Sequence, residues 1–125
     1  MYIQLRDIRT FDGGGGDKFT LPSNIVRFIE FENVAVFFLD ENGKRDKIVG
    51  VKFQYSQIGV CPNHYYVAWE FQVKDRDGKV VPYPFTGMRK MTHKEQELVY
   101  CAHWIGVGYF LNPDTGEIVD KIAIR

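Results

Sequence analysis

The class of fold is decided by the stretch Val34-Ala35-Val36-Phe37-Phe38-Leu39-Asp40-Glu41-Asn42-Gly43-Lys44. Its first six residues are apolar at odd and even positions alike, which is typical of a strand covered on both faces. The Asn-Gly pair that follows suits a tight hairpin turn, because such turns need positive φ, which glycine takes freely and asparagine tolerates. The stretch therefore predicts a strand over residues 34–39, central in a sheet or beneath a helix, that ends in a hairpin.

Two further turn signals lie downstream, at residues 75–79 (Asp-Arg-Asp-Gly-Lys) and 112–117 (Asn-Pro-Asp-Thr-Gly-Glu), and both predict hairpins. Residues 48–55 and 65–74 alternate with period two, as half-buried strands do. One face of the later strand is predicted to form core with Tyr65, Val67, Trp69, Phe71 and Val73.

The residues just before the central strand leave two interpretations open. Residues 25–31 form either a separate strand or the first part of one long strand that a bulge interrupts at Glu32-Asn33. The composition of the segment agrees with both.

One helix is predicted over residues 92–104. Thr92 can cap its first turn, and Glu95, three residues later, completes a capping box. Apolar side chains then recur at helical spacing and predict a stripe that packs on the sheet, formed by Leu98, Cys101 or Ala102, and Ile105. The sequence thus predicts an α+β fold, with one mostly antiparallel sheet of about six or seven strands and this single helix.

Length and composition indicate one domain over residues 1–125. A chain of 125 residues is close to the commonest domain size, and 45% hydrophobic and 15% aromatic residues supply a core without metal or disulfide support. No apolar run approaches the length of a membrane span, and the first ten residues lack a signal-peptide pattern. We therefore expect a cytoplasmic protein with reduced cysteines and no membrane partner.

The charge balance restricts the class of partner. Sixteen basic and sixteen acidic residues give a formal net charge of zero, which argues against a long nucleic-acid footprint. A chain without net charge also lacks electrostatic repulsion between copies, so homo-oligomer formation is a further expectation.

The favoured functional segment is the aromatic and basic loop at residues 83–90. It leads into the predicted helix, whose N-terminal backbone amides near Thr92 attract anions. Rings for stacking and cations lie beside those amides, so this segment predicts a binding domain for an anionic or nucleotide-like small molecule or for a partner protein. The expected binding residues are Tyr83, Phe85, Arg89, Lys90 and Thr92.

A second hypothesis uses the thiols and imidazoles. Cys61 and His64 form a C-x-x-H pair and Cys101 and His103 a C-x-H pair, and thiolate with imidazole is the ligand set that zinc prefers. The same four residues are the candidates for a small enzyme with a Cys101 nucleophile. Helical geometry argues against a shared site, because two residues along a helix turn through about 200°. No serine-hydrolase or metalloprotease motif is present, so we favour binding over catalysis.

Overall fold

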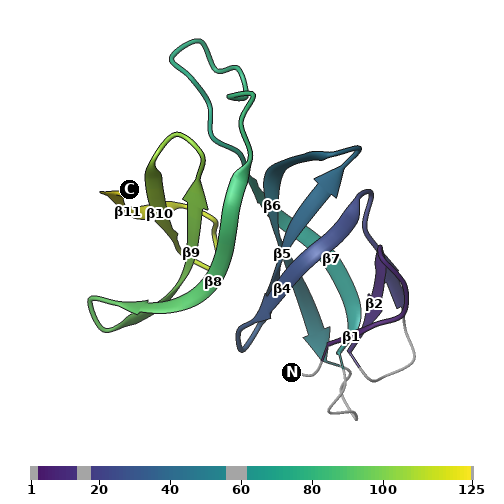
Figure 1. Ribbon diagram of the computed structural model, residues 1–125. Helices are drawn as coiled ribbons and strands as arrows, with labels where there is room; N and C mark the ends of the chain where they lie inside the picture. The colour runs from purple at the N-terminus through teal and green to yellow at the C-terminus, as the bar shows by residue number, and fades with distance from the viewer. Residues whose placement is uncertain (1–2, 14–17, 56–61, 125) are drawn as a thin grey trace.

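The computed structural model describes residues 3–13, 18–55 and 62–124, and these form three antiparallel sheets of 3, 4 and 4 strands (Figure 1). The N-terminal sheet has the order β1-β2-β3, the middle sheet β4-β5-β6-β7 and the C-terminal sheet β11-β10-β9-β8. The strands are β1 Gln4–Leu5, β2 Thr10–Asp12, β3 Lys18–Thr20, β4 Asn24–Glu30, β5 Val34–Glu41, β6 Lys44–Tyr55, β7 Pro62–Phe71, β8 Phe85–His93, β9 Gln96–His103, β10 Val107–Leu111 and β11 Ile118–Ala123.

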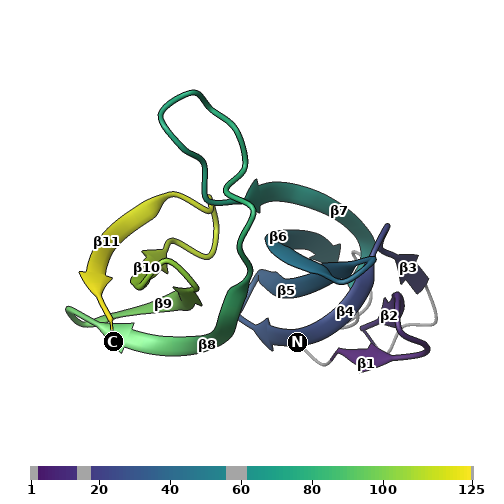
Figure 2. The same cartoon turned by 45° about the horizontal axis from the view of Figure 1, so that its top comes forward.

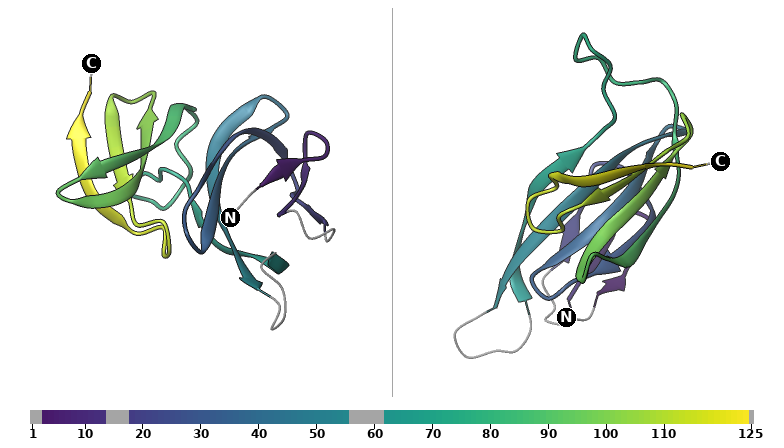
Figure 3. Two further views of the ribbon diagram at one scale, coloured as in Figure 1. Left: turned by 90° about the horizontal axis from the view of Figure 1, so that it is seen from below. Right: turned by 90° about the vertical axis from the view of Figure 1, so that its left-hand side faces the viewer.

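The middle sheet lies between the other two, with a hydrophobic core on each face (Figure 3). Residues 34–39 are all buried, and alternate side chains of this stretch enter opposite cores. Phe37 stacks on Phe11 of the N-terminal sheet with ring centroids 4.6 Å apart, whereas Phe38 meets Phe85 of the C-terminal sheet. The prediction of a central strand covered on both faces is confirmed.

The predicted helix over residues 92–104 is wrong, and the described residues contain no helix. Lys94 and Glu95 take positive φ values of 51° and 67° and form the two-residue turn between β8 and β9, with His93 opposite Gln96. The capping-box spacing was therefore coincidental. Within β9, Val99, Cys101 and His103 are all buried at alternate positions, which is strand periodicity. No helix in the described ranges has the length and apolar character needed to cross a membrane.

The prediction of one sheet of six or seven strands is also wrong. The connection over residues 72–84 takes the chain from the middle sheet to a separate C-terminal sheet and projects beyond both (Figure 1). The predicted turn at 75–79 is present, closed by the Asp75 N–H donating to the Lys79 carbonyl at 2.9 Å. Its flanks form only an isolated bridge between Lys74 and Val80, so this turn joins no pair of long strands.

The other two turns are confirmed as hairpins. Asn42 and Gly43 have φ values of 53° and 87° and join β5 to β6. The turn at 112–117 joins β10 to β11, with the Asn112 N–H donating to the Glu117 carbonyl at 2.9 Å. Of the two interpretations of residues 25–31, the separate strand is correct, because β4 runs antiparallel to β5.

The predicted single aromatic face of residues 65–74 is interrupted. The register between β6 and β7 shifts between Gly50 and Val51, so the strand faces change near the middle of β7. Tyr65 consequently packs in the core toward the N-terminal sheet and Trp69 in the core toward the C-terminal sheet, while Val67 is 41% exposed.

Candidate functional site

The structure distributes the five predicted binding residues over separate places. Phe85 is 2% exposed and meets the His103 ring edge-to-face at 5.0 Å, so it belongs to the core. Thr92 is exposed near the β8–β9 turn, and with the helix absent there are no helix N-terminal amides beside it. The remaining three, Tyr83, Arg89 and Lys90, line three different hollows.

Lys90 lines an open cleft of about 480 Å³ at the end of the interface between the middle and C-terminal sheets. Its ammonium lies 4.6 Å from the centre of the Phe31 ring and 3.6 Å from Glu97 Oε2. The other acidic residues that line this cleft are Glu30, Glu32 and Asp114. Carboxylates thus surround this lysine, and the cleft is unsuited to an anion.

Tyr83 lines a groove of about 300 Å³ between the 72–84 connection and the β5–β6 hairpin. Its side chain is 48% exposed, and Lys44 and Arg45 lie across the groove. Arg45 already pairs with Asp40 at 2.9 Å. The neighbouring β9–β10 turn presents Trp104, which is 64% exposed.

Arg89 lines the third hollow, of about 250 Å³, where the edge strands β4 and β8 approach each other (Figure 2). We call it the arginine hollow. A second arginine lies there together with small and apolar residues, and none of the described residues that line it is acidic. Its lining residues are Arg27, Gly87, Met88, Arg89, Tyr100 and Ala102.

The position of Arg89 is defined by its cross-strand partner. Arg89 lies directly opposite Tyr100 in the β8–β9 pair, and its guanidinium carbon is 5.5 Å from the centre of the tyrosine ring. The ring in turn covers Gly108, where a Cβ atom would lie 2.7 Å from it, and packs 5.0 Å from the Phe110 ring. A guanidinium held over a fixed ring by a cation–π contact needs little further ordering to bind a ligand.

Among the described residues, no acidic side chain pairs with the two arginines that line the arginine hollow. Within the described ranges, neither Arg27 nor Arg89 takes part in an ion pair, whereas Arg6, Arg45, Lys90 and Lys94 do. Both side chains are exposed, and each guanidinium offers five N–H donors and no acceptor. Two positively charged residues therefore line one small hollow, and neither has an acidic partner in the part of the chain that the structure describes.

The residues of the zinc and enzyme hypothesis are not grouped. Cys61 lies outside the described residues, and His64 is exposed on β7. Among the residues that the structure describes, no three histidine, cysteine or acidic side chains are placed to hold a metal. Burial raises the pKa of the Cys101 thiol to about 12, so this thiol is protonated at neutral pH and is a poor nucleophile.

His103 is a buried residue whose ring contacts the surrounding backbone. It is 2% exposed, and its Nδ1 accepts the Ile105 N–H at 3.3 Å. Burial lowers its pKa, opposed by a hydrogen bond to the Tyr83 backbone and by the charge of Asp46. The ring thereby joins β9 to the 72–84 connection.

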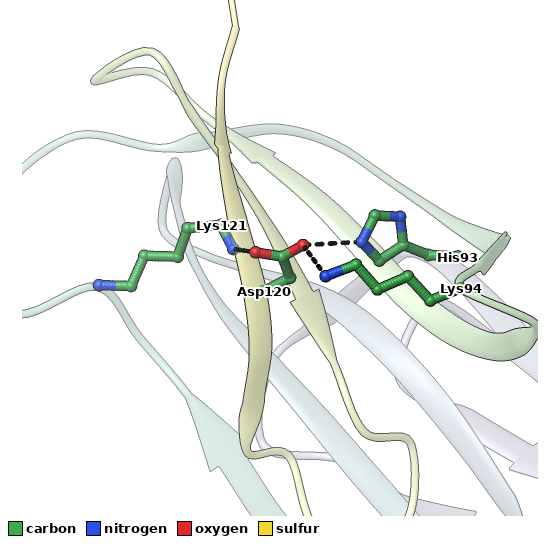
Figure 4. Close-up of polar contacts among 4 residues, drawn as sticks. All are labelled: His93, Lys94, Asp120 and Lys121. Carbon is green, nitrogen blue, oxygen red and sulfur yellow. Dashed lines mark hydrogen bonds and ion pairs between the residues drawn. The ribbon is translucent and has the colours of Figure 1, made fainter.

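A polar cluster that the sequence analysis missed lies on the same sheet as Arg89 (Figure 4). Asp120 Oδ2 lies 2.8 Å from His93 Nε2 and 3.4 Å from Lys94 Nζ, and Oδ1 accepts the Lys121 N–H at 2.9 Å. The hydrogen bond from His93 is the largest of the causes that lower the pKa of Asp120. Both carboxylate oxygens of Asp120 have partners, and the contacts with His93 and Lys94 link β11 to the β8–β9 hairpin.

Comparisons with protein-family models, curated proteins and solved structures found no match for this chain.

The sequence pattern points to Arg89 but not to the residues that surround it in the hollow. Tyr100 lies as far after the Lys94-Glu95 turn as Arg89 lies before it, so recognising a hairpin there would have paired the two. No local pattern marks Arg27, which reaches the hollow only because β4 and β8 approach each other in three dimensions.

Proposed function

We propose that this chain is a cytoplasmic, non-catalytic binding domain that holds a small anionic ligand in the arginine hollow. The observation that carries the proposal is that Arg27 and Arg89 both line one hollow, and that none of its described lining residues is acidic. An anion in this hollow would be attracted by both positive side chains. A nucleotide-like ligand would enter with its phosphate end.

The chemistry of arginine favours this assignment. A guanidinium presents planar forks of N–H donors that match the oxygens of carboxylates and phosphates two at a time. In Arg89 that plane is already oriented by the Tyr100 ring. The buried, apolar Met88 also lines the hollow, and an apolar neighbour strengthens the attraction between a cation and a bound anion.

The proposal is tested by calorimetric titration of a panel of small anions at constant ionic strength. The variants Arg27→Gln and Arg89→Gln each remove one guanidinium from a solvent-exposed side chain. The matched control is Arg76→Gln, which removes the same charge from the exposed turn at residues 75–79.

Binding that weakens in both hollow variants and not in the control supports the site. Equal affinity in all four proteins, or no binding of any anion by the wild type, contradicts it.

A second candidate function, contact with a partner protein, has its own observation. The exposed rings of Trp104 and Tyr83 lie on adjacent segments, joined by the Trp104 N–H donating to the Pro84 carbonyl at 3.0 Å. Exposed tryptophan and tyrosine are enriched where proteins meet. The first partner to test is a second copy of the chain, in line with the expected homo-oligomer.

Sedimentation of the wild type and of Trp104→Ser tests this candidate. It predicts an oligomer that dissociates in the variant. A wild type that stays monomeric at all concentrations, or an oligomer that the variant leaves intact, contradicts it.

A further inference from the structure

We infer that the ligand of the arginine hollow is the phosphate group of a small molecule, bound as a dianion that bridges Arg27 and Arg89. The inference rests on the proposed function and makes it specific: it names the class of anion and assigns one ion to both side chains.

The two guanidiniums come from different sheets. Arg27 lies on β4, opposite Phe38 of β5 in the middle sheet, and Arg89 lies on β8 in the C-terminal sheet. β4 and β8 are the outermost strands of their sheets and form no ladder with each other. An anion held by both arginines therefore adds a polar link at a junction that lacks backbone hydrogen bonds.

The number of donors and the charge favour phosphate over carboxylate. Two guanidinium forks offer about four N–H groups and two positive charges. One carboxylate has two oxygens and a single charge, and one arginine fork satisfies it. A phosphomonoester has three terminal oxygens and a charge of about −2 at neutral pH, so it can accept from both forks and neutralise both charges.

The space in the hollow suits a small group. A Cβ atom built on Gly87 would meet nothing within 4 Å, and its neighbour across the hairpin, Ala102, has the smallest side chain that carries a Cβ. The volume of about 250 Å³ is below the range of about 300–1,000 Å³ that is usual for sites of drug-sized ligands. A phosphate group, with the rest of its molecule in solvent, fits this description.

A side chain added at Gly87 would fill the hollow without disturbing the backbone. Its backbone does not have the positive φ that excludes side chains, in contrast to Gly43 at 87° and Gly78 at 79°. Gly87→Val therefore fills part of the hollow with a side chain. The substitution causes no backbone strain from a positive φ and no clash at Cβ.

The decisive experiment is a double-mutant cycle of phosphate binding. Inorganic phosphate, glycerol phosphate, acetate and phosphatidylcholine vesicles that contain phosphatidic acid are titrated at constant ionic strength. The proteins are the wild type, Arg27→Gln, Arg89→Gln and the double variant, with Gly87→Val and Arg76→Gln alongside. Bridging predicts that each single variant weakens binding of both phosphates by roughly tenfold or more, and that the double variant is little weaker than either single one. Gly87→Val weakens binding and Arg76→Gln does not.

The outcomes separate this inference from the proposed function. Acetate bound as tightly as phosphate, with the same dependence on the two arginines, preserves the anion site and overturns the phosphate assignment. Losses that simply add in the double variant overturn the bridge. Binding only to phosphatidylcholine vesicles that contain phosphatidic acid, without binding of glycerol phosphate, overturns the small-molecule source. No binding of any anion overturns the proposed function as well.

Discussion

The indole N–H of Trp69 donates to the Pro113 carbonyl at 2.8 Å and thereby links the middle sheet to the β10–β11 turn of the C-terminal sheet. The ring lies between two glycines. A Cβ atom on Gly50, its partner on β6, would approach the ring to 2.2 Å, and one on Gly116 would approach it to 2.5 Å. This packing predicts the effect of adding one methyl group at either position.

Gly50→Ala is predicted to lower the free energy of unfolding by about 1–3 kcal/mol, because the buried ring must move to admit the methyl group. Gly116→Ala adds backbone strain at φ 73° to the clash. Two controls separate these causes, since Gly43→Ala has the strain without the clash and Gly87→Ala has neither. Urea unfolding should rank Gly87→Ala as nearly neutral and Gly43→Ala as milder than Gly116→Ala, and the reverse ranking would refute the packing described.

The β8–β9 turn predicts an unusual gain from glycine. Glu95 has φ 67°, a conformation that glycine adopts without steric cost, so Glu95→Gly should stabilise the protein by up to about 1 kcal/mol. Glu97→Gly, two residues later within β9 and opposite Thr92, should destabilise it. Chemical denaturation distinguishes hairpin from helix, because in a helix over 92–104 both glycines would lower stability.

The lowered pKa of His103 predicts a loss of stability in mild acid. Below the ordinary value of 6.5, the unfolded chain binds a proton that folded His103 takes up only at lower pH, so protonation favours unfolding there. In His103→Gln, the free energy of unfolding should decrease less steeply as the pH is lowered below about 6.5. His64→Gln, at an exposed position, is the control; an unchanged slope in His103→Gln would count against this account.

The Cys101 thiol is predicted to be unreactive toward alkylating reagents in the folded protein. Its buried thiol has a pKa of about 12 and its sulfur lies 3.7 Å from the Tyr109 carbonyl oxygen. In a Cys61→Ser background Cys101 is the one remaining thiol, and alkylation by iodoacetamide should require denaturant. Rapid alkylation under native conditions would show that the thiol is accessible and would reopen the nucleophile hypothesis.

The parts of the fold that local patterns determine were predictable. Residues 34–39 are apolar at every position and are buried on both faces, and Asn42-Gly43 is a pair that suits only a tight turn. The β8–β9 turn was missed because Lys94 and Glu95 adopt positive φ that their side chains do not favour. Thr92 and Glu95 then mimicked a helix cap.

The site was predictable only in part because it is a tertiary feature. Arg89 belongs to the basic segment that the sequence singles out, but the five residues of that prediction are neighbours along the chain and not in space. Strand geometry sends successive side chains to opposite faces, so Met88 enters the core while Arg89 meets Tyr100 on the other side. Arg27 joins them from another sheet.

Phosphate that bridges Arg27 and Arg89 can be detected by observing the two guanidiniums themselves. In a proton–nitrogen NMR spectrum, the side-chain Nε–Hε signals of Arg27 and Arg89 can be followed as inorganic phosphate is added at constant ionic strength, with assignments from the glutamine variants. Bridging predicts that both signals shift along one titration curve with a single dissociation constant, while the Arg76 signal does not move. Signals that stay in place, or that follow two different constants, would contradict it.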